Sequence, residues 1–355
     1  MFLGLSEIRH DKARFILILV VIALVSYLTY FLTALAYGLA TSYTQGIDKW
    51  QASGIVLTKD ANDNIARSLL HESDYEAITA DQNARLGVSA ATVELSEKED
   101  VTIFGVEDDS FIAPNITEGR AAQESDEVVA SDELKAIGFV LNDTLQLTGT
   151  TLRYKIVGFT DRATFQTAPI LYMSLDEWRT VAAKLSGMTA MRDSSTVNAI
   201  AMRGENVNIK NKDAVKWQTI RDFSFTLPGY SAQVATFSLM IGFLIFIASF
   251  VLAIFIYILT IQKKSIFGIL KAEGVPNSYI SRSVKTQIVI LVISGMAIGL
   301  ACTLITGFGL AGKIPFMVQP LFFMGITTLF LFFSAVGGIA SVRVVTKIDP
   351  VEAIG

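Results

Sequence analysis

Four long stretches of the chain carry no charged residue, and they dominate its pattern of polar and apolar positions. About 20 apolar residues are enough to cross the hydrocarbon layer of a bilayer, because an α-helix rises about 1.5 Å per residue. Each stretch is longer than that, so the pattern predicts four transmembrane helices. Helices buried in a soluble core are the alternative, but four such stretches argue against it. The stretches are residues 15–40, 231–262, 287–312 and 314–342.

The first stretch also resembles a signal peptide. Arg9, Lys12 and Arg14 precede it, and Ala34-Leu35-Ala36 supplies a possible cleavage site. Cleavable signals, however, carry an apolar region of only about 7 to 15 residues. We therefore interpret residues 14–41 as an uncleaved signal anchor and first transmembrane helix.

The segment between the first two spans has the pattern of an α+β domain. Short runs with period-two alternation predict strands, and Asn142-Asp143 and Gly149 predict turns between them. Helices are expected over residues 132–137 and over 175–185, the second with Ser174 as N-cap and Glu177 three positions later. The first span is expected to continue as a helical stalk to Trp50. The predicted strands are 55–58, 101–106, 127–130, 145–147, 152–159 and 168–173.

Two shorter segments have amphipathic character. Residues 1–13 predict a helix that would lie on the membrane surface, since Phe2, Leu3, Leu5 and Ile8 can share one face. Residues 263–285 predict a helical elbow. In it Gly274 and Pro276 end one helix, and Asn277 or Ser278 caps the next.

Charge placement predicts the orientation. Residues 41–232 hold 28 acidic and 18 basic residues, whereas the remainder of the chain holds 5 acidic and 11 basic. The basic excess flanks the spans at both termini and between the second and third spans. By the positive-inside rule these parts are cytoplasmic, and the acidic domain lies outside.

Composition excludes several classes of function. Hydrophobic residues make up 52% of the chain and charged residues 17%, which is low for a soluble protein. The single cysteine, Cys302, cannot form a disulfide within the chain. No basic domain suggests nucleic-acid binding.

The sequence contains no complete motif for catalysis or metal binding. Residues 307–313 fit the start of a P-loop, but Ile314 replaces the required Ser or Thr. His71 has no second histidine at zinc-protease spacing. Acidic residues near positions 97–100 and 107–109 lack the EF-hand pattern, and we expect solvated turns there. We expect no metal site, no catalytic residue and no permanently bound cofactor.

None of the four spans contains an ionisable acid or base, which argues against a proton- or ion-coupled pump. Any transport would draw its energy from another source.

The layout resembles the permease subunits of MacB/FtsX-type (type VII) ABC transporters. These have one span, a large outer domain and then three spans. The resemblance covers nearly the whole chain. Its most specific pieces are Gly268-Ile-Leu-Lys-Ala-Glu-Gly274 and Lys347-Ile-Asp-Pro-Val-Glu-Ala-Ile354, with further similarity around Phe104-Gly-Val106, Gly119-Arg120, residues 127–132 and residues 143–158.

This resemblance implies a homodimer bound to two copies of a separate ATPase, which would carry out ATP hydrolysis, so the chain itself would not be an enzyme. It also implies a coupling helix at residues 266–274 whose apolar edge sits in the ATPase, and a C-terminal contact. The implied coupling residues are Ile266, Phe267, Ile269, Leu270, Lys271, Glu273, Asp349 and Pro350.

Within the family, the short length and the run Tyr257-Ile-Leu-Thr-Ile-Gln-Lys263 resemble permeases of Gram-positive heme-efflux systems. That resemblance implies lateral entry of heme, as substrate, from the outer leaflet between two protomers. Aromatic rings could stack on the porphyrin, and a tyrosinate can ligate ferric iron. An interfacial aromatic belt is the structural alternative. The implied binding residues are Tyr37, Tyr43, Trp50, Tyr230 and Gln233.

We therefore expect an α-helical membrane protein with four transmembrane helices and an α+β extracytoplasmic domain between the first two. Export of a glycolipid or peptide, or FtsX-like regulation of a cell-wall hydrolase or sensor, are the alternative functions. The expected layout is 1–13 amphipathic helix, 14–41 first span, 42–230 outer domain with stalks, 231–262 second span, 263–285 coupling loop, 286–312 third span, 313–342 outer loop and fourth span, and 343–355 cytoplasmic tail.

Overall fold

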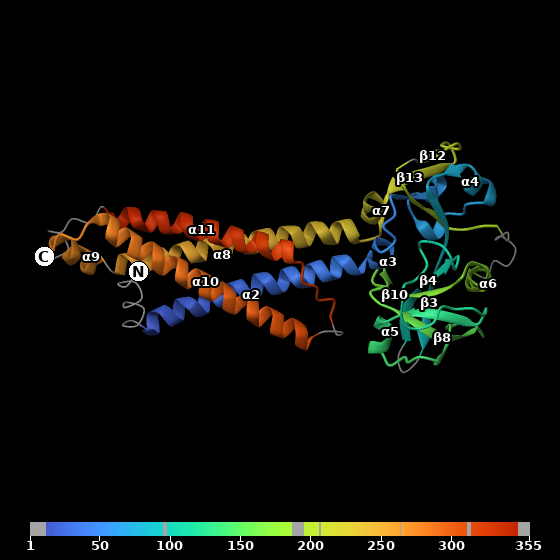
Figure 1. Ribbon diagram of the computed structural model, residues 1–355, viewed down its shortest axis with the longest axis horizontal. Coiled ribbons are helices and arrows are strands. Elements are labelled where there is room, and N and C mark those ends of the chain that lie inside the picture. The colour runs from blue at the N-terminus through green and yellow to red at the C-terminus, as the bar shows by residue number, and fades with distance from the viewer. Residues whose placement is uncertain are drawn as a thin grey trace. The chain divides into compact units, whose positions relative to one another are not determined.

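The computed structural model describes residues 12–94, 98–186, 195–205, 207–262, 264–310 and 314–346. The chain divides into two compact units (Figure 1). One, here called the helical unit, comprises residues 1–38 and 235–355. The other, the sheet unit, comprises residues 39–234. The sheet unit is thus inserted between the first and second long helices, as the sequence predicts.

Within the described part of the chain, four helices are long and apolar enough to span a membrane, which confirms the predicted number. They are α2 (Lys12–Ser42), α8 (Tyr230–Gln262), α10 (Asn277–Gly309) and α11 (Pro320–Thr346), with the short α9 (Lys264–Ala272) between α8 and α10. The predicted elbow differs in one respect. Its second helix and the third span are one continuous helix, α10. The residue at the N-cap of α10 is Pro276, so neither Asn277 nor Ser278 takes the capping position.

Within the helical unit, α2 and α10 approach closely because α10 presents glycine to α2. A Cβ on Gly299 would lie 2.8 Å from the carbonyl oxygen of Ala23, and one on Gly295 would lie 2.5 Å from Ile22. One turn beyond Gly299, Thr303 Oγ1 donates a hydrogen bond to the carbonyl oxygen of Tyr27 at 3.3 Å. Small residues four apart, with a cross-helix hydrogen bond, are how membrane helices pack without a hydrophobic driving force.

The sheet unit is built on one large mixed sheet. Among the described residues its main path runs β13-β1-β11-β3-β4-β10-β6-β8-β5. β7 pairs with β8, β9 pairs with β10, and β2 pairs with β12 separately. Most neighbours are antiparallel, but β10 runs parallel to β4 and β6 runs parallel to β8. The strands are β1 (Gly54–Thr58), β2 (Ile78–Thr79), β3 (Gln82–Glu94), β4 (Lys98–Val106), β5 (Ile116–Gly119), β6 (Glu127–Ser131), β7 (Thr144–Gln146), β8 (Arg153–Thr160), β9 (Thr164–Phe165), β10 (Ala168–Ser174), β11 (Ala199–Arg203), β12 (Asn208–Ile209) and β13 (Val215–Thr219).

Both faces of this sheet are buried, and alternate residues of a strand belong to different cores. In β4, Ile103 packs into one core with Trp178, and Phe104 packs into the other with Trp50. The first face is covered by α6, and the second carries α3 and α7. The helices and 3₁₀ turns of the unit are α3 (Gln45–Asp48), η1 (Lys59–Ala61), η2 (Ile65–Arg67), α4 (Glu72–Glu76), α5 (Glu133–Ala136), α6 (Leu175–Ser186) and α7 (Ile220–Thr226).

A pair of glycines seats α6 on the sheet. Gly87 and Gly105 lie opposite each other on β3 and β4. A Cβ on either would come within 2.4 Å of the Trp178 side chain. Trp178 is fully buried there, and its Nε1 donates a hydrogen bond to Ser89 Oγ at 3.0 Å. Because neither glycine has a side chain, the indole can lie directly on the sheet.

The six strands and two helices expected from the sequence are all present, with ends displaced by up to three residues. The predicted cap also forms: the backbone N–H of Glu177 donates to Ser174 Oγ at 3.3 Å. The expected stalk to Trp50 does not form, because α2 ends at Ser42 and only the short α3 follows. Residues 1–11 and the C-terminal residues 347–355 lie outside the described residues, as do the predictions made for them.

Candidate ligand site and coupling helix

Three aromatic side chains gather in the sheet unit where the chain enters α8. The rings of Tyr43 and Tyr230 have centroids 5.6 Å apart, and Phe225 meets Tyr230 edge-on at 5.5 Å. These three residues are called the aromatic cluster below. Phe225 is 42% exposed, so the cluster is open to its surroundings.

Local backbone structure places Tyr230. Helix α7 begins with Thr219, whose Oγ1 accepts a hydrogen bond from the backbone N–H of Asp222 at 3.1 Å. Pro228 and Gly229 then turn the chain into α8, with Gly229 at φ +81°. A Cβ on Gly229 would lie 3.5 Å from Tyr43 Oη, so the turn passes close to the other tyrosine.

Hydrogen bonds to strand β9 and the residue after it position Tyr43. Its carbonyl oxygen accepts a hydrogen bond from the backbone N–H of Gln166 at 3.0 Å. Just before it, the carbonyl oxygen of Ser42 accepts one from Thr164 Oγ1 at 2.8 Å. The end of α2 is thereby tied to strand β9, which fixes the tyrosine against Tyr230.

Gln233 adds a polar group to the same helix face. It lies three residues after Tyr230 in α8, and its backbone N–H donates to the carbonyl oxygen of Gly229 at 2.9 Å. Its side-chain Nε2 is buried and has no hydrogen-bond partner within the described part of the chain. An unsatisfied buried donor is uncommon in native proteins and is a group that a ligand can satisfy.

The other two predicted ligand residues lie elsewhere. Trp50 is 3% exposed, and its ring centroid lies 5.9 Å from that of Phe104 within one of the two cores of the sheet unit. It therefore has no free face for a ligand. Tyr37 belongs to the helical unit, where its ring lies 5.4 Å from that of Phe322. Sequence reasoning missed Phe225, although an aromatic residue just before the Pro228-Gly229 turn was a usable signal.

The segment predicted to be the coupling helix is helical, as α9, but it presents a different edge from the expected one. Ile266 and Ile269 are 48% and 49% exposed, whereas Phe267 is only 2% exposed and belongs to the core of the helical unit. Leu270 is partly buried against that same core. Of the four apolar residues assigned to the exposed edge, only the two isoleucines occupy it.

The end of α9 is well defined. Gly274 adopts φ +87°, and the backbone N–H of Val275 reaches back to the carbonyl oxygen of Leu270 at 3.0 Å. This left-handed glycine ending is a common way to stop a helix. Lys271 is partly buried and Glu273 exposed in the last turn. Asp349 and Pro350 lie outside the described residues.

Within the described residues no group of His, Cys, Asp and Glu could hold a metal ion. Of the acidic residues near position 107, Glu107 accepts a hydrogen bond from Arg85 at 2.7 Å, and Asp108 and Asp109 are exposed. The aromatic cluster and the exposed edge of α9 are the features of the described residues considered below.

Comparison with known proteins identifies a permease domain and similar proteins. Residues 238–350 match the model for the FtsX-like permease C-terminal domain. Over its entire length the chain is 25% identical to a protein of Staphylococcus epidermidis named hemin transport system permease protein HrtB, covering 99% of that protein. The C-terminal part of the chain is thus an FtsX-like permease domain, and the whole chain is similar to ABC transporter permeases.

More distant relatives of this permease extend the similarity. A Staphylococcus haemolyticus protein also named HrtB is 23% identical, covering all of this chain and 99% of its own. An uncharacterized ABC transporter permease of Mycobacterium bovis is likewise 23% identical, covering all of this chain and 99% of that protein. Among solved structures, the extracellular domain of the ABC-type transporter YknZ from Gram-positive bacteria aligns with 42% of this chain and 84% of its own, at 12% identity and a TM-score of 0.30.

Proposed function

We propose that this permease exports heme, which it captures laterally from the outer leaflet at the interface of a homodimer. The observation that carries the proposal is the aromatic cluster, with the unsatisfied Nε2 of Gln233 on the same face of α8. Planar aromatic rings stack on a porphyrin, and a tyrosine oxygen is an established ligand of ferric heme iron. Full-length similarity to proteins named as hemin transport permeases supports heme over other amphipathic compounds.

Within this proposal Tyr43, Phe225 and Tyr230 provide the stacking surface. Gln233 donates a hydrogen bond to a porphyrin substituent. A carboxylate at that position would be the stronger ligand for iron, so iron ligation falls to Tyr43 or Tyr230. Tyr37 belongs to the helical unit and is not assigned to this surface, while the buried Trp50 supports the fold.

The energy for export comes from two copies of a separate ATPase, which dock on α9. Ile266 and Ile269 leave an apolar edge on a helix that also carries Lys271 and Glu273. Such an edge favours burial in a partner. In this arrangement both chain termini and α9 are cytoplasmic, and the sheet unit lies outside the bacterial plasma membrane.

The test is heme content in cells that express the permease together with its ATPase. After hemin exposure we expect these cells to retain less heme than cells with an inactive ATPase. The double variant Tyr230→Ala/Gln233→Ala should return the heme content to that of the inactive control. Tyr257→Ala, an exposed tyrosine in the part of α8 that belongs to the helical unit, serves as the matched variant and should export normally.

Two results would overturn the proposal. Full export by the double variant would exclude the aromatic cluster as the binding site. Unchanged heme content with wild-type protein would reject heme as substrate, and would favour a glycolipid or peptide substrate or the regulation of a cell-wall hydrolase or sensor.

A further inference from the structure

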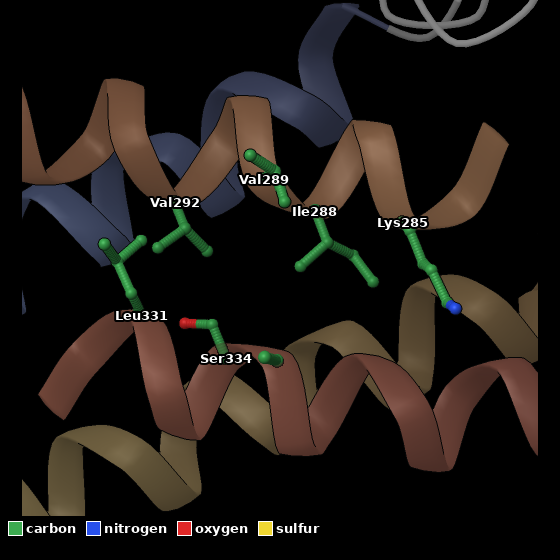
Figure 2. Close-up of a pocket in the computed structure, with 7 residues that line it drawn as sticks. Lys285, Ile288, Val289, Val292, Leu331 and Ser334 are labelled. Carbon is green, nitrogen blue, oxygen red and sulfur yellow. The ribbon is translucent and has the colours of Figure 1, made fainter. Parts of the chain in front are cut away.

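A second binding feature lies in the helical unit, between α10 and α11 (Figure 2). It is a half-open cavity of about 260 Å³. From α10, Ile288 and Val292 point into it, and from α11 Leu331 and Ser334 face them. Lys285 stands at one end of the cavity, one turn before Ile288. The described residues that line it are Lys285, Ile288, Val289, Val292, Leu331, Ser334 and Ala335.

The cavity is apolar along its length and charged at one end. Its one hydroxyl group, on Ser334, donates a hydrogen bond to the carbonyl oxygen of Phe330 at 2.6 Å. That hydroxyl is therefore already satisfied within its own helix. A cavity that offers so few polar partners does not hold water well, and it favours hydrocarbon. Among the described residues that line the cavity, Lys285 alone is charged.

Helix length places this charge at the level of lipid headgroups. Helix α10 continues for 24 residues beyond Lys285, to Gly309, which at about 1.5 Å per residue exceeds the roughly 30 Å of a hydrocarbon layer. Val292 lies two turns deeper and so within the hydrocarbon. The cavity thus runs from the membrane surface inward, with its cation at the surface.

We propose that this cavity binds an anionic phospholipid, with one acyl chain between α10 and α11 and the phosphate on the Lys285 ammonium. The occupant must be hydrocarbon along most of its length and negative at one end, and an anionic lipid has both properties. Basic pockets between transmembrane helices are known to recognise anionic headgroups. With the orientation proposed above, the lipid belongs to the cytoplasmic leaflet.

The experiment is native mass spectrometry of the full-length protein, released from detergent after incubation with defined lipids. The probes are palmitoyl-oleoyl phosphatidylglycerol and phosphatidylcholine, which share acyl chains and differ in net charge. We expect about one phosphatidylglycerol per chain and at least fivefold weaker retention of phosphatidylcholine, since one lysine–anion contact at the surface accounts for about that factor.

Three variants distinguish the contribution of the Lys285 charge to lipid retention from that of the apolar cavity. Lys285→Gln should weaken phosphatidylglycerol retention about fivefold. Arg282→Gln removes an exposed charge one turn earlier that does not line the cavity, and should change retention less than twofold. Ala335→Leu fills the cavity and should reduce the retention of both lipids, while circular dichroism shows unchanged helix content.

Equal retention of the two lipids, or equal effects of Lys285→Gln and Arg282→Gln, would overturn the proposal. So would retention that Ala335→Leu leaves intact, because the acyl chain would then lie elsewhere. A second protein chain released by Ala335→Leu would instead identify this face as a contact between copies. None of these results depends on whether the permease exports heme.

Discussion

Glu127 shows how a single residue organises part of the sheet unit. It stands at the start of β6 with its side chain 8% exposed, and Arg120 pairs with it through both guanidinium NH₂ groups. The backbone N–H groups of Gln123 and Glu124 also donate to its carboxylate, at 2.9 and 3.3 Å. The hydrogen bonds from Arg120, with those of the two backbone groups, lower the pKa of Glu127 from 4.5 to about 2.

This lowered pKa predicts acid sensitivity. Because the carboxylate is stabilised in the folded state, its contribution is complete above the unfolded pKa of 4.5 and disappears as the pH falls toward 2. Glu127→Gln should be less stable than wild type at pH 7 but lose less stability between pH 5 and pH 2. Urea unfolding of the full-length chain, followed by tryptophan fluorescence, measures this directly. All three tryptophans, at positions 50, 178 and 217, lie in the sheet unit.

Glu124→Gln is the matched control, since this neighbouring carboxylate is exposed. Its unfolding midpoint should follow pH as the wild type does. A parallel loss of stability in wild type and Glu127→Gln would contradict the role given to the Arg120–Glu127 pair.

At the scale of single residues, the sequence indicates residue types but not always which surface they face. Tyr43 and Tyr230 were predicted as site residues, and the structure brings them together. Trp50 was predicted beside them but is in the core, because the expected stalk ends at Ser42 and the chain turns under the sheet. Phe267 was placed on an exposed edge and is buried, because the packing of α9 against its neighbours decides which side of that helix is free.

Among the elements, α9 is the one whose role depends most on a partner. Its exposed Ile266 and Ile269 lie three residues apart on one side, while Phe267 anchors the other side to the helical unit. A substitution that charges the exposed side therefore tests docking, and one that charges Phe267 tests folding.

Ile266→Asp/Ile269→Asp should reduce co-purification of the ATPase by a factor of about ten or more, because the interface would have to bury two unpaired charges. The permease itself should elute normally from size-exclusion chromatography. Ser278→Asp, at an exposed polar position in α10, should keep the ATPase bound. Phe267→Asp should instead reduce the yield of folded permease. Undiminished ATPase binding by the double variant would remove α9 from the interface.

The elements themselves were predictable where the signal was strong. The four apolar spans were predicted, as were several strands rich in β-branched residues, such as β4 and β8. The longest strand, β3, was missed. Its sequence Gln-Asn-Ala-Arg-Leu-Gly-Val-Ser-Ala-Ala-Thr-Val-Glu contains Asn, Gly and three Ala, which have low strand propensity. Pairing on both sides, with β11 and β4, supplies the stabilisation that propensity does not.

For the whole molecule, the distribution of charged residues predicts how the chain is oriented in the membrane. The sheet unit should be extracellular, and α9 cytoplasmic. In a Cys302→Ala background, Lys212→Cys should react in intact cells with a maleimide that cannot cross membranes, whereas Glu273→Cys should react only after lysis. Both positions are exposed, so accessibility of the side chain does not limit either reaction. The reverse labelling pattern would invert the proposed topology.

The central claim, that the aromatic cluster binds heme, is tested most directly by titrating the purified full-length protein with hemin in detergent and following the Soret band. We expect a saturable shift at about one heme per dimer. Tyr230→Ala/Gln233→Ala should weaken the affinity about tenfold or more, because stacking and a polar contact are both lost. Tyr230→Phe should keep the stacking but alter the spectrum if its hydroxyl ligates iron, and Tyr257→Ala should bind as wild type does. A spectrum no different from hemin in empty micelles, or an unchanged affinity in the double variant, would contradict the account.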